Sequence, residues 1–100
     1  ELVDEIAKDM AAGDPEVGVS AMRNTLAWFL GGGVPQLERL PVNVVCVNSD
    51  LYATDVESNR TIVPGYKVHI QEGVGHFLMR EKPEEFNALL DKALADFGWE

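Results

Sequence analysis

The chain has 100 residues, of which 46% are apolar and 25% are charged, the composition of one small globular domain. Its 17 acidic residues outnumber 8 basic ones, which gives a net charge of -9. Nucleic acids and anionic membranes are bound by clustered cations, so this balance argues against both as partners. The one cysteine, Cys46, cannot form a disulfide within the chain, which indicates a reducing, cytoplasmic location. No apolar run is long enough to span a bilayer.

The N-terminal third of the chain predicts two helices. Apolar residues recur at helical spacing over residues 2–12, which predicts the first helix. The second helix runs from residue 15 to about residue 30, with Asp14 as its N-cap and Pro15 at its first position. A short linker or a single helical turn is expected over residues 36–40.

A strand–helix–strand unit is predicted in the middle of the chain. The β-branched run over residues 42–47 predicts a strand buried on both faces, as is typical of parallel sheets. A helix over residues 54–63 is predicted to begin with a capping box formed by Thr54 and Glu57. Residues 66–71 predict the second strand. Two strands joined by one helix are expected to be parallel neighbours.

The last predicted element is a helix that begins near Pro83 and can be capped by Gly98. Its predicted apolar face comprises Phe86, Leu89, Leu90, Ala93, Leu94 and Phe97. The order of elements predicts an α/β fold with a parallel sheet. Two parallel strands do not make a stable sheet alone, and an open strand edge favours association. We therefore expect an additional chain or self-association to complete the sheet.

Two residues with catalytic chemistry follow the predicted strands. Asp50 comes just after the first strand, and His76 lies in the loop after the second. Because ligands bind beyond the carboxyl ends of parallel strands, both side chains are expected at the same edge of the sheet. A carboxylate there can orient an imidazole, whose second nitrogen then serves as a general base. The alternatives are an Asx-turn for Asp50 and a structural hydrogen bond for His76.

Two segments of the chain resemble the α/β-hydrolase family. Pro41-Val42 followed by Asp50 is similar to the strand and acid of that family. The run Gly73–Met79, continued by Glu81–Asn87, is similar to its histidine loop and final helix. The resemblance covers about residues 35–97.

The resemblance implies a fold and a function. Residues 35–100 would form the C-terminal strand–helix–strand–helix portion of an α/β-hydrolase parallel sheet, preceded by two cap helices within residues 1–34. Asp50 and His76 would be the acid and the histidine of a catalytic triad. The complete enzyme would hydrolyse an ester, amide or related bond of a small-molecule substrate, without a metal or other cofactor.

The family's nucleophile is not predicted in this chain. The segment nearest to its G-x-S-x-G elbow surrounds Ser20, but it lacks the second glycine and a preceding strand. The alternative function is therefore a catalytically inactive fragment that self-associates or complements another chain.

For the other candidate residues, a structural role is an alternative to a functional one or is the expected role. The side chains of Met22, Trp28 and Phe29 either line a substrate pocket or pack between helices. His69 is expected to be a partly exposed strand residue that shares a face with Lys67, and not a second catalytic base.

Overall fold

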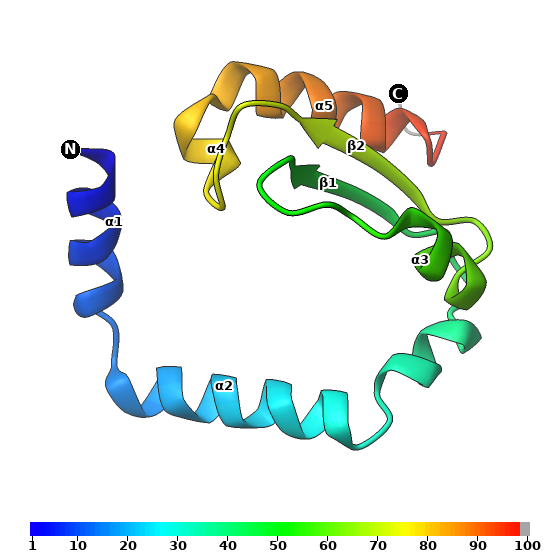
Figure 1. The fold of residues 1–100 in the computed structure, drawn as a ribbon, viewed down its shortest axis with the longest axis horizontal. Coiled ribbons are helices and arrows are strands. Elements are labelled where there is room, and N and C mark those ends of the chain that lie inside the picture. Colours follow the sequence, from blue (N-terminus) through cyan, green and yellow to red (C-terminus); the bar gives the residue numbers. More distant parts are fainter. Residues whose placement is uncertain (99–100) are drawn as a thin grey trace. The chain divides into compact units, whose positions relative to one another are not determined.

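The computed structural model describes residues 1–98, which form a mixed α/β fold (Figure 1). The elements are the helices α1 (Leu2–Ala11), α2 (Pro15–Leu30), α3 (Val56–Ile62), α4 (Leu78–Glu81) and α5 (Pro83–Ala95), the 3-10 helix η1 (Val34–Arg39), and the strands β1 (Val45–Ser49) and β2 (Lys67–Gln71). The chain divides into two compact units, residues 1–37 and residues 38–100. Within the described residues, no helix is long and apolar enough to cross a membrane.

The first unit contains the two predicted N-terminal helices. The N-cap prediction for α2 is confirmed, because the Asp14 carboxylate accepts a hydrogen bond from the Glu16 amide at 2.8 Å and Pro15 opens the helix. The helix leaves many apolar side chains exposed, among them Val17, Val19, Met22, Leu26, Trp28, Phe29 and Leu30. The rings of Trp28 and Phe29 contact each other edge-on, with centroids 5.2 Å apart.

The sheet of the second unit has two strands in the described part of the chain, and they are parallel as predicted. Val45 lies opposite Lys67, and Ser49 lies opposite Gln71. The predicted start of the first strand at residue 42 is wrong, because β1 begins at Val45. The ladder starts only where β2 starts, so residues 42–44 have no strand residues opposite them on β2.

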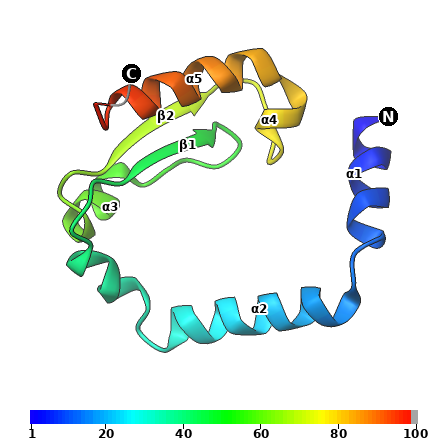
Figure 2. The same ribbon diagram turned by 180° about the vertical axis from the view of Figure 1, so that it is seen from behind.

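The prediction that the first strand is buried on both faces is also wrong. The residues from Val45 to Asn48 are only half-buried, and Ser49 alone is buried. Figures 1 and 2 show α5 running alongside β2, where it covers the sheet. The small apolar core consists of Tyr66, Val74, Leu78 and Ala93. A second layer that would bury the other face of the strands is not found in residues 38–98.

The start of helix α3 differs from the prediction. Its N-cap is Asp55 and not Thr54, because the Asp55 carboxylate accepts hydrogen bonds from the Ser58 amide at 3.0 Å and the Ser58 hydroxyl at 2.7 Å. The Thr54 hydroxyl instead accepts a hydrogen bond from the Asn48 side chain at 2.9 Å. This contact ties the start of α3 to the end of β1.

Helix α5 begins at Pro83 as predicted, and Gly98 follows it with a φ of 73°, a conformation that favours glycine. The Gly98 amide donates to the carbonyl of Ala95 at 2.9 Å. The predicted apolar face is only partly covered by the sheet. Ala93 is buried and Phe86 and Leu89 are half-buried, whereas Leu90, Leu94 and Phe97 are exposed.

Candidate functional site

Both predicted site residues follow the carboxyl ends of neighbouring strands. Asp50 comes directly after β1, and His76 lies in the loop of residues 72–77 that follows β2. The last residues of the two strands, Ser49 and Gln71, are paired in the parallel register. The two segments therefore leave the sheet at the same edge, and the Asp50 amide still donates to the Gln71 carbonyl at 3.2 Å.

The carboxylate of Asp50 binds the backbone of the histidine loop. The amide of Gly73 donates to its two oxygens at 3.0 and 2.9 Å, and the amide of Val74 lies 3.5 Å from Oδ1. These amides stabilise the ionised acid. The bond from Gly73 is the main reason that the pKa of Asp50 lies below its ordinary value of 3.8, and the positive charge of Lys82 adds a smaller effect.

Gly73 adopts a backbone conformation that the loop requires. Its φ of 66° lies in the left-handed region, where a side chain is strained. This bend turns the amides of Gly73 and Val74 toward Asp50. At the start of the loop, the Lys82 ammonium donates a hydrogen bond to the Glu72 carbonyl at 3.3 Å.

The imidazole of His76 is exposed and contacts the ring of Phe77 edge-on, with centroids 5.2 Å apart. Within residues 1–98, no hydrogen bond joins this imidazole to Asp50: the carboxylate holds the loop and not the ring. The structure thus brings the two predicted residues to one edge of the sheet but does not pair their side chains. Their roles as acid and base stay predictions.

A further carboxylate contacts the same loop. Glu81, in α4, accepts a hydrogen bond from the Gly75 amide through its Oε2 at 2.5 Å. Glu81 lies in the segment that resembles the family, but no role was predicted for it. The short helix α4 was not predicted, and without that turn nothing indicates that Glu81 reaches back to the loop.

The other candidate residues belong to other elements of the chain. His69 contacts Asp96 through its Nε2 at 2.7 Å. Ser20 lies inside α2, where its hydroxyl accepts a hydrogen bond from the Asn24 side chain at 3.3 Å. A serine inside a helix does not have the geometry of a nucleophile elbow, which requires a turn between a strand and a helix. Cys46 is half-buried in β1.

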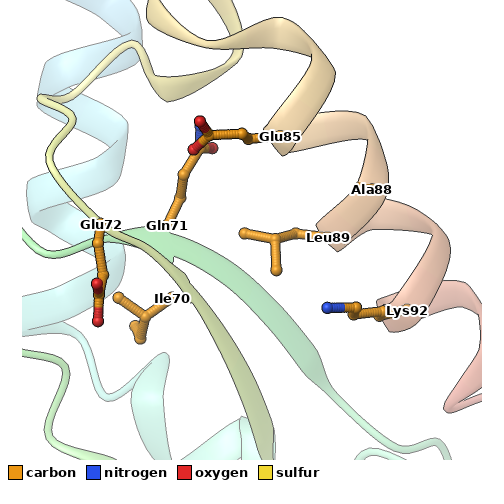
Figure 3. A pocket seen from close by; sticks show the side chains of 7 residues that line it. All are labelled: Ile70, Gln71, Glu72, Glu85, Ala88, Leu89 and Lys92. Carbon is orange, nitrogen blue, oxygen red and sulfur yellow. The ribbon is translucent and has the colours of Figure 1, made fainter.

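A hollow of about 350 Å³ lies between the end of β2 and helix α5 (Figure 3). It is lined by Ile70, Gln71, Glu72, Glu85, Ala88, Leu89 and Lys92. Figure 3 shows Leu89 and Lys92 projecting from α5 into the space beside β2. The lining contains no histidine, serine or cysteine, so this hollow offers neither a hydroxyl or thiol nucleophile nor an imidazole base.

The chain matches no family model, no curated protein and no solved structure. Among residues 1–98, no group of three or more histidine, cysteine or acidic side chains is arranged to hold a metal ion.

Proposed function

We propose that this chain supplies the acid, Asp50, and the histidine, His76, of a catalytic triad in an α/β-hydrolase fold. The nucleophile lies outside the sequence of 100 residues. One observation carries the proposal: the Asp50 carboxylate accepts hydrogen bonds from Gly73 and Val74, in the loop that bears His76. The acid that follows one strand is thereby attached to the histidine loop that follows its parallel neighbour.

The two residues have distinct roles in this proposal. His76 takes the proton of the nucleophile as it attacks the carbonyl of an ester or amide, and returns it to the leaving group. Asp50 accepts the other ring N–H of His76 and stabilises the imidazolium. An ionised carboxylate has about four acceptor positions, so Asp50 can hold the loop amides and the ring at the same time. The low pKa of Asp50 suits this role, because the acid must remain ionised.

A second candidate function is that of an interaction module that completes its sheet with another copy or another chain. It is favoured by the half-buried strand β1, by the exposed apolar residues Leu90 and Leu94 of α5, and by the exposed Phe97 that follows this helix. A two-stranded sheet with such surfaces gains stability when further strands or helices cover it. The two functions are compatible, since a partner chain can also bring the nucleophile.

Light scattering on the purified chain, combined with intact mass spectrometry, tests the need for a partner. We expect an assembly larger than the 11.0 kDa monomer, formed with itself or with a second chain. A folded monomer would contradict both the incomplete sheet and the interaction module.

Hydrolysis of a nitrophenyl ester tests the catalytic roles. We expect no turnover by the chain alone, and turnover that His76→Ala and Asp50→Asn abolish when a nucleophile-bearing chain is present. His69→Ala is the matched control, since His69 lies away from the loop and should leave turnover unchanged. Turnover by the isolated chain that disappears in His76→Ala would show that the nucleophile is within this sequence.

A further inference from the structure

We propose that Glu81 is a positioning residue for His76. It is a second carboxylate that binds the histidine loop, and it follows the loop in sequence, whereas Asp50 precedes it. Its Oε2 accepts the hydrogen bond of the Gly75 amide. Gly75 directly precedes His76, so this bond restrains the backbone from which the histidine projects. This inference rests on the proposed function, because positioning His76 matters only if His76 is catalytic. The hydrogen bond itself can be tested without measuring ester hydrolysis.

Three consecutive amides of the loop are bound by carboxylates. Gly73 and Val74 donate to Asp50, which follows β1, and Gly75 donates to Glu81, which belongs to α4. A loop outside helices and strands has no ladder partners for its amides, so each binds either a side-chain acceptor or water. Ionised acceptors form hydrogen bonds that are roughly twice as strong as neutral ones. The loop is therefore held at two points that come from different elements.

Glu81 is placed for this role by the buried start of its helix. Leu78, the first residue of α4, is 6% exposed and belongs to the core. The amide of Glu81 donates to the Phe77 carbonyl at 3.0 Å, which closes the turn. The core thus fixes the backbone of Glu81, and only its side-chain torsions remain to be ordered when it binds Gly75.

The absence of a side chain at Gly75 leaves room for the carboxylate of Glu81. A Cβ atom there would lie 3.2 Å from Oε2 and 3.3 Å from Oε1 of Glu81, closer than most such contacts. A side chain at position 75 would push the carboxylate away from the amide. Glycine at this position leaves the carboxylate of Glu81 in place beside the amide, and the φ of Gly75 is not in the left-handed region that favours glycine.

Amide hydrogen exchange by NMR on the full chain tests the proposal with three variants. In Glu81→Ala we expect the Gly75 amide to exchange about tenfold faster, the change that loss of one hydrogen bond to a charged group produces. Glu81→Gln keeps an acceptor without the charge and should restore part of the protection. Glu84→Ala is the matched control, because this exposed glutamate lies at the start of α5 and should leave Gly75 unchanged.

A second readout separates positioning from a general loss of structure. We expect the proton contacts between the rings of His76 and Phe77 to weaken in Glu81→Ala and to return in Glu81→Gln, while the amide signals of β2 stay in place. If Glu81→Ala does not fold, the chemical shift of the Gly75 amide proton in Glu81→Gln tests the hydrogen bond. We expect this signal to move upfield, because a neutral acceptor forms a weaker hydrogen bond. An unchanged Gly75 amide in the folded Glu81 variants would overturn the inference. Failure of the proposed function would appear in the ester assay instead, and would leave these signals unaffected.

Discussion

The Nε2 of His69 lies 2.7 Å from Oδ2 of Asp96, and the ammonium of Lys67 lies 2.7 Å from Oδ1 of the same carboxylate. These contacts join β2 to the residue that directly follows α5. His69 shares a face with Lys67, and its side chain is 24% exposed, as the sequence predicted. The partner of His69 was not predicted, because Asp96 is 27 residues away in the chain. This histidine–aspartate pair is a structural contact between a strand and a helix end.

Replacing Asp96 should loosen the end of α5. Asp96→Asn removes the charge that binds both Lys67 and His69, so we expect a lower free energy of unfolding and faster amide exchange near Leu94. Asp91→Asn is the control, since it makes the same chemical change on the exposed side of the helix. Urea unfolding of both variants measures the difference. Equal effects of the two substitutions would mean that the contacts of Asp96 contribute nothing to stability.

The lowered pKa values of Asp50 and Asp96 predict how stability depends on pH. Amides of the loop lower the pKa of Asp50, and bonds from Lys67 and His69 lower that of Asp96, in both cases below 3.8. A carboxyl group whose pKa is lower in the folded state stabilises the fold at pH values above 3.8 and loses this contribution as the pH falls through the folded pKa. We therefore expect thermal stability to fall below pH 4.

The double variant Asp50→Asn/Asp96→Asn supplies the control for this pH dependence. It carries neither of the two groups, so its melting temperature should decline less between pH 5 and pH 2 than that of the parent chain. Parallel declines in parent and variant would assign the acid sensitivity to other carboxyl groups.

The sequence predicted those features that depend on residues close together in the chain. Asp14 caps α2 because its carboxylate reaches an amide only two residues away, and such a bond can be read directly from sequence. The parallel pairing of β1 with β2 follows from the single helix between them. In the site, the placement of Asp50 and His76 after neighbouring strands was predictable for the same reason.

The remaining features depend on contacts between distant residues. The start of β1 is set by Lys67, with which Val45 pairs, and the run of valines contains no sign of that limit. Thr54 does not cap α3 because its hydroxyl is engaged by Asn48 of the preceding strand, which leaves the cap to Asp55. The bond from Gly75 to Glu81 requires a helical turn too short to be recognised from periodicity.

Leu78, two residues after His76, belongs to the small apolar core. Its side chain is 6% exposed, so Leu78→Ala should lower the free energy of unfolding by about 3 kcal/mol. Met79, its neighbour, is 42% exposed, and Met79→Ala should cost only about 0.5 kcal/mol. Chemical denaturation measures both. Similar small losses would mean that Leu78 borders an open pocket and does not close the core.

Gly33 lies against the indole of Trp28, so a larger residue there should displace the ring. A Cβ atom at position 33 would lie 2.1 Å from Cε2 of Trp28, far inside contact distance. We expect Gly33→Ala to lower the free energy of unfolding by about 2 kcal/mol and to shift the tryptophan emission to longer wavelength as the indole moves into water. The measurement uses a Trp99→Phe background, because the chain has 2 tryptophans.

Gly18→Ala is the matched control for Gly33→Ala. A Cβ atom at Gly18 has no heavy atom within 4 Å, and the residue lies inside α2. Alanine restricts the unfolded chain and favours the helix, so this change should raise the free energy of unfolding by about 0.5–1 kcal/mol and leave the emission of Trp28 unchanged. If Gly33→Ala also left the emission of Trp28 unchanged, the indole would not lie against Gly33 in solution. The aromatic end of α2 would then be free to pack elsewhere.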